Sequence, residues 1–387
     1  MAAHDLLTRA VGSVIPKKLA EDKLASGQKL RIYLGIDPTG SRLHLGHAVA
    51  LRKMQAFVDA GHHVIFLIGS FTAMIGDPSG RDTQREPLTA EQVRENFRTY
   101  KEQASKVLDF SCVEIRQNNE WLDTVTLKDL VGLAGNFTVQ QMMQREMFEK
   151  RIEEGKPIGV HEFLYPVMVG YDSVVLDVDC EMGGTDQEFN MLAGRTLQKA
   201  FGKREKFILT TKLLEGTDGR KMSKTYDNCI WLEDSAKDMY GKLMSVNDNL
   251  IAQYMECCTN IPMEEISTIE KAMTKGENPK AFKMRLARDV VSLYHGDAAA
   301  AEAEGEWTRV FSQHELPEDM EEIAAKKGEL LGDVLVRATL ISSKSDFRRL
   351  IDQKGIHLNN KVVQDVNATV EEGVVKVGKR RFGRIVL

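Results

Sequence analysis

Residues 30–68 read LRIYLGIDPTGSRLHLGHAVALRKMQAFVDAGHHVIFLI, and this stretch decides the fold of the first part of the chain. Residues 30–36 form a short apolar run that ends in the turn-forming sequence Asp-Pro-Thr-Gly, so we predict a strand and a tight turn. Apolar residues recur at helical spacing over 44–60, Gly61 ends this helix, and residues 64–68 form a second apolar run. This order is typical of a βαβ unit and a parallel sheet.

The remaining pattern predicts an α/β body, then a helical part, then a small module of mixed helix and strand. A charged helix is expected near 89–108, amphipathic helices dominate from about residue 226, and a further helix begins near Ser343. Further strands are expected at 174–178, 207–210, 356–358, 374–377 and 383–387. The predicted fold class is therefore α/β with a parallel sheet.

The composition bounds the class of protein. The chain has 387 residues, 42% of them hydrophobic and 28% charged, which suits a packed protein of about two or three domains. It contains no apolar run long enough for a membrane-spanning helix, and its N-terminus has no apolar stretch typical of a signal peptide. Its five cysteines follow no metal-ligand spacing, and their odd number argues against a disulfide framework. We therefore expect a globular protein of the cytoplasm, with no membrane partner.

Charge is unevenly distributed along the chain. Residues 331–387 hold eleven Lys and Arg and six Asp and Glu, a net charge of +5, whereas the whole chain carries −5. A basic module on an acidic body indicates a polyanionic partner bound at one end. A solvated, lysine-rich edge would explain the charge alone equally well.

His44-Leu-Gly-His47 follows the first predicted strand, at the start of the predicted helix. Free backbone N–H groups and the helix dipole favour anions such as phosphate at that point. Two imidazoles three residues apart share one helix face, and both can donate to a polyphosphate. Gly46 has no Cβ, so a flat group such as adenine can lie against the backbone. Chance is the alternative, and the position after a strand and turn argues against it.

Lys221-Met-Ser-Lys224-Thr follows the glycine-punctuated loop 216–220. Two ammonium groups on such a loop suit negative charge that develops while a phosphate linkage breaks. A lysine pair in a loop is more often merely solvated. The presence of His44 and His47 in the same chain weakens that interpretation.

The two signatures together are those of class I aminoacyl-tRNA synthetases, and the chain resembles the bacterial tyrosyl-tRNA synthetase family with a KMSKT loop. The C-terminal module is similar to the S4-like RNA-binding domain that ends these enzymes. The resemblance runs through Tyr33-Leu-Gly-Ile-Asp37-Pro-Thr-Gly40, Ile75-Gly-Asp77-Pro-Ser-Gly80, Tyr165-Pro, Tyr171-Asp172 and Gly183-Gly-Thr-Asp186-Gln187.

The resemblance implies an order of domains. A Rossmann-like catalytic domain covers 1–220, with a dimerisation insertion near 121–165 that makes the protein a homodimer. The KMSKT loop and a helical domain cover 221–314. A linker at 315–330 leads to the S4-like α+β module at 331–387.

The resemblance also implies the reaction, which joins L-tyrosine to tRNA(Tyr) in two steps. The carboxylate of tyrosine attacks the α-phosphate of ATP, which gives tyrosyl-adenylate and pyrophosphate. The terminal ribose of the tRNA then takes the tyrosyl group. No protein nucleophile is needed, so catalysis consists of alignment and charge stabilisation. Mg²⁺ is expected on the ATP phosphates, and no protein-bound metal is expected.

Site residues are implied position by position. The tyrosine-binding positions are Tyr33 and Asp172 at the phenol, with Asp77, Tyr165 and Gln187 at the amino group. The ATP-binding positions are Asp37, Gly46, Gly184, Asp186 and Lys224. The catalytic positions are Thr39, His44, His47, Lys221, Lys224, and the pair Arg81 and Arg85 on a loop that closes on pyrophosphate. Arg348 and Arg349 are the expected RNA contacts.

A phenol held between a hydroxyl and a carboxylate disfavours phenylalanine, because the analogue would leave Tyr33 and Asp172 unpaired. One position departs from the family. Val169 stands where a glutamine usually touches the substrate's amino group, and valine neither donates nor accepts a hydrogen bond. Either Asp77 and Gln187 suffice, or the amino-acid site is altered. We favour the interpretation of Val169 as a packing residue.

Two other functions are compatible with the motifs. A different nucleotidyltransferase would use the histidine and lysine pairs without tRNA, but Tyr33, Asp172 and the basic C-terminus argue against it. An RNA-binding paralogue that has lost charging activity is the second alternative. The complete set of signature histidines and lysines argues against that one.

Overall fold

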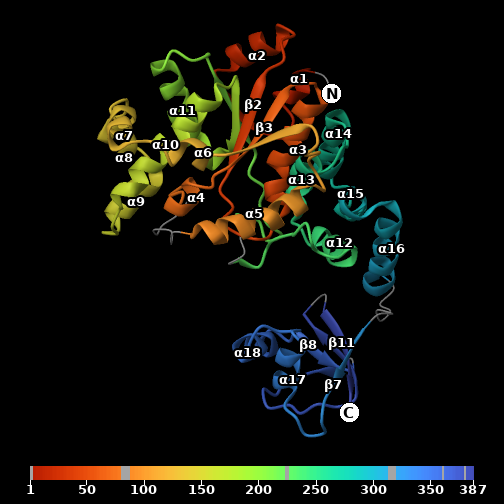
Figure 1. Ribbon diagram of the computed structural model, residues 1–387. Coiled ribbons are helices and arrows are strands. Elements are labelled where there is room, and N and C mark those ends of the chain that lie inside the picture. Colours follow the sequence, from red (N-terminus) through yellow and green to blue (C-terminus); the bar gives the residue numbers. More distant parts are fainter. Residues whose placement is uncertain (1–2, 80–87, 223–225, 313–319, 360, 379–380) are drawn as a thin grey trace. The chain divides into compact units, whose positions relative to one another are not determined.

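The computed structural model describes residues 3–79, 88–222, 226–312, 320–359, 361–378 and 381–387. The chain forms two compact units, Met1–Ala300 and Ala301–Leu387 (Figure 1). No helix among the described residues is both long enough and apolar enough to cross a membrane.

The first unit is built on a six-stranded sheet with the order β1-β6-β5-β2-β3-β4. The strands are β1 (Val11–Ile15), β2 (Arg31–Ile36), β3 (His63–Ile68), β4 (Val113–Gln117), β5 (Cys180–Gly184) and β6 (Phe207–Thr211). β2 to β6 pair in parallel, and only β1 runs antiparallel, against β6. The predicted parallel sheet is confirmed, as is the βαβ unit of β2, α3 (Leu45–Asp59) and β3.

Helices cover both faces of this sheet, as the apolar strands require. Figure 1 shows α10 and α11 on one side of the strands and α3 and α13 on the other. The helices of this unit are α1 (Ala3–Leu6), α2 (Lys17–Ala25), α3, α4 (Thr72–Ile75), α5 (Ala90–Ala104), α6 (Asn119–Leu122), α7 (Leu127–Ala134), α8 (Val139–Met143), α9 (Glu146–Glu153), α10 (Val160–Leu176), α11 (Glu188–Ala200), α12 (Ala236–Met244), α13 (Ile251–Cys258), α14 (Met263–Thr274) and α15 (Pro279–His295). A further helix, α16 (Asp297–Trp307), spans the boundary between the two units.

The strand predicted at 174–178 is wrong. α10 continues to Leu176, and Asp177 ends it in the left-handed conformation with φ 45°. Val174 and Leu176 are buried from within the helix, so a short apolar run here reflects helix packing. Such a run does not by itself distinguish a buried strand from the last turn of a buried helix.

The second unit is a five-stranded sheet packed against two helices. Its strand order is β7-β11-β10-β8-β9. The elements are β7 (Glu321–Ala324), α17 (Leu331–Arg337), α18 (Lys344–Asp352), β8 (Ile356–Leu358), β9 (Lys361–Val362), β10 (Gly373–Val377) and β11 (Arg381–Val386). The helix predicted near Ser343 is confirmed, because the Ser343 side chain caps α18 by accepting from the Asp346 N–H. The three strands predicted for this module are also present.

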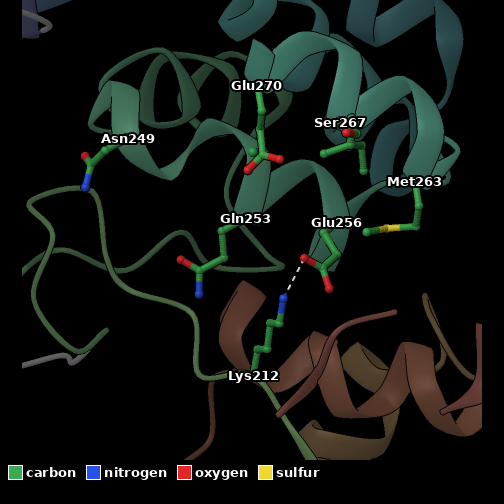
Figure 2. A pocket seen from close by; sticks show the side chains of 9 residues that line it. Lys212, Asn249, Gln253, Glu256, Met263, Ser267 and Glu270 are labelled. Carbon is green, nitrogen blue, oxygen red and sulfur yellow. Dashed lines mark hydrogen bonds and ion pairs between the residues drawn. The ribbon is translucent and has the colours of Figure 1, made fainter. Parts of the chain in front are cut away.

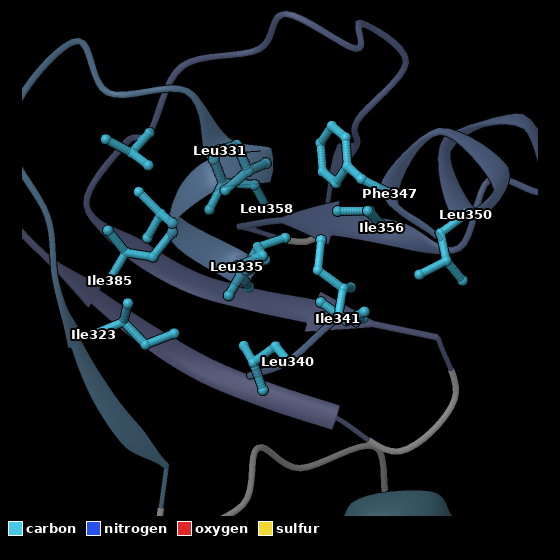
Figure 3. Close-up of a cluster of buried hydrophobic side chains, with 14 of the residues drawn as sticks. Ile323, Leu331, Leu335, Leu340, Ile341, Phe347, Leu350, Ile356, Leu358 and Ile385 are labelled. Atoms are coloured by element: carbon cyan, nitrogen blue, oxygen red, sulfur yellow. The ribbon is translucent and has the colours of Figure 1, made fainter. Parts of the chain in front are cut away.

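The second unit has a hydrophobic core of its own, which Figure 3 shows between the helices and the sheet. Leu331, Leu335, Phe347 and Ile356 lie at its centre, each at most 2% exposed. Ile323 of β7 also joins this core, and β7 pairs in parallel with β11. Residues 321–324, which the sequence assigned to a linker, therefore belong to this sheet.

We expect Leu335→Ala to destabilise the second unit by about 2–5 kcal/mol, because it leaves a cavity in a core that is closed to water. Hydrogen exchange followed by mass spectrometry should show faster exchange in α17, β8 and β10 and unchanged exchange in β2 and β3. The control Val366→Ala shortens a side chain that is 38% exposed, and it should leave the exchange rates of both sheets unchanged. Equal loosening of both sheets would contradict the independence of the two cores.

Candidate active site

The candidate site lies where the carboxyl ends of β2 and β5 meet. From β2 the chain proceeds to β3 and β4 on one side of the sheet, whereas β5 and β6 lie on the other. Such a change of direction opens a crevice at the carboxyl ends of the central strands. Asp37 follows β2, and Asp186 and Gln187 follow β5.

Asp37 is held by hydroxyl groups from two helices. Its Oδ1 accepts from Thr72 Oγ1 at 2.7 Å, and its Oδ2 accepts from Tyr165 Oη at 2.9 Å. A Cβ at Gly69 would clash with this carboxylate, so the chain needs glycine there. Burial, together with Asp37, raises the pKa of Tyr165 well above its usual value and keeps the hydroxyl a donor. This carboxylate therefore faces the crevice in a fixed orientation.

Tyr33 and Asp172, the predicted phenol contacts, are 1% and 2% exposed. Asp172 Oδ1 accepts from Trp121 Nε1 at 2.8 Å, and its Oδ2 accepts from Asn118 Nδ2 at 3.2 Å. Tyr33 Oη lies 2.9 Å from Ser173 Oγ. Burial raises the pKa of Asp172 well above its ordinary value, while the two donors oppose that shift. Burial also raises the pKa of Tyr33, and the charge of nearby Asp172 adds to the effect.

Asn118 links these two parts of the site. Its Nδ2 donates to Thr72 Oγ1 at 3.0 Å as well as to Asp172, and its Oδ1 accepts from the Phe71 N–H at 2.8 Å. Because Thr72 in turn donates to Asp37, one line of hydrogen bonds joins both carboxylates. The positions of Asp172 and Asp37 are therefore coupled through two neutral side chains.

The predicted amino-group ligands Asp77 and Gln187 also lie together. Gln187 Nε2 donates to Asp77 Oδ2 at 2.7 Å, and the Ser79 N–H donates to Asp77 Oδ1 at 2.9 Å. Asn190 Nδ2 donates to Gln187 Oε1 at 2.8 Å, and Arg145 Nη2 donates to Ser79 Oγ at 2.7 Å. Burial lowers the pKa of Arg145 to about 10, so it is a cation at pH 7. This network orients Asp77 and Gln187 with donors that the sequence analysis did not identify.

His44 and His47 stand at the first turn of α3, as predicted. The His44 backbone N–H donates to His47 Nδ1 at 3.2 Å, so the proton of a neutral His47 is on Nε2. The two ring centroids are 3.8 Å apart. Burial, His47 and Lys221 lower the pKa of His44 to about 2, so it is a neutral donor at pH 7. A Cβ at Gly46 would lie 3.0 Å from the His44 ring, so glycine leaves room for it.

The lysine signature begins beside these histidines. The Leu45 N–H donates to the Ile230 carbonyl at 2.9 Å, which ties α3 to the chain just after the signature loop. A Cβ at Gly46 would lie 3.9 Å from Met222 Sδ. Lys221 Nζ lies 3.3 Å from Asp186 Oδ2, at the end of β5. The structure therefore brings the two separate signatures to one crevice.

The other predicted residues fall in three groups. Thr39 lies in the turn after β2, Gly184 is the last residue of β5, and Val169 is half-buried on α10. Arg348 and Arg349 are both exposed on α18 of the second unit, and Arg349 is paired with Asp346. Arg81, Arg85 and Lys224 lie outside the described residues.

Sequence reasoning missed several residues that hold the site. Ser79, Ser173 and Asn190 stand within three positions of predicted residues, so local sequence offered a weak signal. Nothing in the local sequence marks the remaining ones, which reach the site through tertiary packing. These are Asn118, Trp121 and Arg145.

Two observations concern other binding chemistry. Within the described ranges, no group of three or more His, Cys, Asp and Glu side chains is placed to hold a metal ion. A separate hollow of about 390 Å³ lies between the chain after β6 and helices α13 and α14 (Figure 2). Lys212 and Glu256 form an ion pair at its edge, with 2.8 Å between Nζ and Oε2.

Comparison with known proteins covers both units. Residues 25–312 match the family described as tRNA synthetases class I (W and Y), and residues 331–376 match the S4 domain. The tyrosine–tRNA ligase of Thermotoga maritima is 45% identical over 98% of this chain and 96% of that protein. The tyrosine–tRNA ligase of Carboxydothermus hydrogenoformans is 43% identical over 99% of this chain and 97% of that protein.

Solved structures share the fold. The tyrosyl-tRNA synthetase of Archaeoglobus fulgidus complexed with L-tyrosine has a TM-score of 0.63 at 20% identity, covering 78% of this chain and 99% of that one. A truncated mitochondrial tyrosyl-tRNA synthetase of Coccidioides posadasii has a TM-score of 0.61 at 26% identity, covering 76% of this chain and 88% of that one. The resemblance inferred from the sequence motifs is thus confirmed. The chain belongs to the class I tRNA synthetases of the tryptophan and tyrosine group.

Proposed function

We propose that the protein is a tyrosine–tRNA ligase, which joins L-tyrosine to tRNA(Tyr) with ATP in two steps. The names of relatives that align over nearly the whole chain support this assignment. The observation that carries it is the buried pair of Tyr33 and Asp172. A phenol between them would donate its proton to the carboxylate and accept from the Tyr33 hydroxyl, which an indole or a phenyl ring does not do.

In the first step, tyrosine and ATP are aligned at the crevice. We assign the amino group of tyrosine to Asp77, Gln187 and Tyr165, so that Val169 acts as a packing residue. Asp37, Asp186 and Gly184 take the tyrosyl and ribose groups, and Gly46 leaves room for the adenine. These roles agree with carboxylates held at the carboxyl ends of β2 and β5.

The phosphates of ATP then meet the donors at the start of α3. Thr39, the neutral His44 and the Nε2–H of His47 are assigned to the polyphosphate and adenosine. Lys221 supplies positive charge as the α–β phosphate bond breaks. We assign the same role, stabilising the negative charge on the departing pyrophosphate, to Lys224, Arg81 and Arg85. Mg²⁺ accompanies the ATP phosphates.

In the second step, the terminal ribose hydroxyl of the tRNA attacks the tyrosyl carbonyl of the adenylate, forms an ester with the tyrosyl group and releases AMP. We assign residues 1–220 to catalysis, 221–314 to the signature loop and helical domain, and 331–387 to RNA binding. Arg348 and Arg349 are both exposed on one helix while Phe347 and Leu350 anchor it in the core, as phosphate contacts require. We also propose a cytoplasmic location, which is consistent with the free thiols of all five cysteines.

We also propose a homodimer that pairs through the insertion near 121–165. Large apolar side chains in this segment are more than half exposed, which is unusual for a surface that faces water. These side chains are Leu127, Val131, Val139, Ile152 and Val160. They belong to α7, α8, α9 and the start of α10, which lie together in Figure 1.

The proposal is tested by amino-acid-dependent exchange of pyrophosphate into ATP. We expect exchange with tyrosine and not with tryptophan or phenylalanine. Asp172→Asn should lower kcat/KM for tyrosine by about 10-fold or more, because an amide replaces the carboxyl group that accepts the phenol proton. The control Asp179→Asn changes a carboxylate that is 5% exposed at the opposite end of β5 and should leave exchange unchanged. Exchange with another amino acid, or none at all, would refute the assignment.

Arg348→Glu/Arg349→Glu should reduce tRNA charging about 10-fold or more and leave pyrophosphate exchange unchanged, because only the RNA phosphates are repelled. Lys17→Glu/Lys18→Glu on exposed α2 alters net charge equally and serves as the control. Undiminished charging by the arginine variant would exclude α18 as an RNA contact.

Leu127→Lys/Val131→Lys should convert the dimer to a monomer in analytical ultracentrifugation, since burying two ammonium groups in an apolar interface is unfavourable. Met263→Lys, at a position that is 38% exposed on α14, is the matched control. A wild-type monomer, or a variant dimer of unchanged affinity, would contradict the proposed interface.

A further inference from the structure

An ion pair without access to water lies directly beneath Tyr33. The side chains of Lys206 and Glu181 are 0% and 4% exposed, and they contact each other through Nζ and Oε2. Lys206 Nζ also donates to Ser173 Oγ at 2.7 Å, and Ser173 Oγ donates to Glu181 Oε2 at 3.0 Å. The Lys206 ammonium lies 6.0 Å from the centre of the Tyr33 ring.

The topology of the sheet places this cluster against both phenol contacts. Tyr33 on β2 and Glu181 on β5 are direct partners in the parallel register. Lys206 comes one residue before β6, the neighbour of β5 on its other side. Ser173 follows Asp172 on α10. A change in this cluster therefore reaches Tyr33 through Ser173, and Asp172 along the same helix.

The surrounding structure makes room for this cluster. A Cβ at Gly194 on α11 would clash with Lys206 Nζ and Ser173 Oγ. A glycine inside a helix is less favourable than an alanine at the same position. Gly194 therefore makes α11 less stable than an alanine would, but it leaves the space that the cluster occupies.

Stability alone gives a weak reason for such a pair. Removing two charges from water costs more than their attraction commonly returns, and well-packed apolar residues often replace buried ion pairs without loss. Burial lowers the pKa of Lys206, and the carboxylate of Glu181 opposes that shift. The feature that apolar residues would not reproduce is the hydrogen bonding to Ser173.

A count of donors and acceptors shows what the pair does for Tyr33. An ammonium only donates, a carboxylate only accepts, and a serine hydroxyl has one proton and two lone pairs. Ser173 gives its proton to Glu181 and receives one from Lys206, so its remaining lone pair faces Tyr33 Oη at 2.9 Å. Ser173 therefore has no proton to give Tyr33, so the Tyr33 hydroxyl acts as a donor, and Ser173 keeps both charged partners if Tyr33 turns its proton to a ligand.

We infer that the Lys206–Glu181 pair determines specificity in the proposed tyrosine activation, by holding Ser173 so that Tyr33 can donate to the phenol oxygen. This inference rests on the proposed function. Lys206 and Glu181 act as positioning residues, because they act on the substrate through Ser173 and Tyr33. Burial and the nearby Glu181 raise the pKa of Tyr33, which keeps its hydroxyl protonated at neutral pH.

The test is a double substitution that removes both charges together, Lys206→Met/Glu181→Leu, so that no single charge stays buried. In tyrosine-dependent pyrophosphate exchange we expect kcat/KM to fall about 10-fold, mainly through KM, because one hydrogen bond to the phenol is weakened. In a Tyr33→Phe background the same double substitution should change kcat/KM less than about 2-fold, since the hydroxyl that it positions is already absent.

The matched control is Arg151→Met/Glu162→Leu, which removes another ion pair with side chains 1% and 3% exposed. That pair joins α9 to α10 and should change kcat/KM less than about 2-fold. Circular dichroism checks that each variant folds. If the first variant does not fold, Lys206→Gln/Glu181→Gln removes the charges and keeps polar groups of similar length.

An equal loss of kcat/KM in the wild-type and Tyr33→Phe backgrounds would overturn the inference, because the pair would then act independently of the Tyr33 hydroxyl. Unchanged kcat/KM in the wild-type background would overturn it as well. Absence of tyrosine-dependent exchange in the wild-type protein is a different result, which refutes the proposed function itself.

Discussion

Burial of the Asp172 carboxylate is the constraint on which the site depends. A carboxylate that is 2% exposed needs donors from the protein, and it receives them from Trp121 and Asn118. Both donors follow β4, whereas Asp172 itself lies on α10. The hydrogen bonds of Asn118 and Trp121 therefore join the segment just after β4 to α10.

The same hydrogen bonds give the crevice a fixed shape. Asn118 donates to Thr72, and Thr72 donates to Asp37, so each carboxylate limits where the other can lie. Such a network is rigid when every member is satisfied, and it makes an unpaired ligand costly. A site of this kind selects a substrate by the polar groups that the substrate supplies, which is the property that an enzyme specific for tyrosine needs.

The local patterns of the sequence were sufficient for the βαβ unit and the helix near Ser343, whereas the two signatures at His44 and Lys221 were linked only by the family resemblance. The local patterns were not sufficient where contacts with distant segments determine the secondary structure or the hydrogen-bond partners of a residue. The run at 174–178 packs as the last turn of a helix, and β7 joins a sheet formed mostly by residues more than thirty positions away. Asn118 and Arg145 are ordinary polar residues in sequence, and only tertiary packing gives them a place in the site.

The central claim is that a buried pair of polar groups recognises a phenol hydroxyl. Isothermal titration calorimetry of the wild-type protein with L-tyrosine and L-phenylalanine tests this claim without any chemical step. Tyrosine is predicted to bind about 100-fold more tightly, because phenylalanine offers Asp172 no proton and gives Tyr33 no oxygen to which it can donate. Equal affinity for the two amino acids, or no binding of tyrosine, would contradict the account.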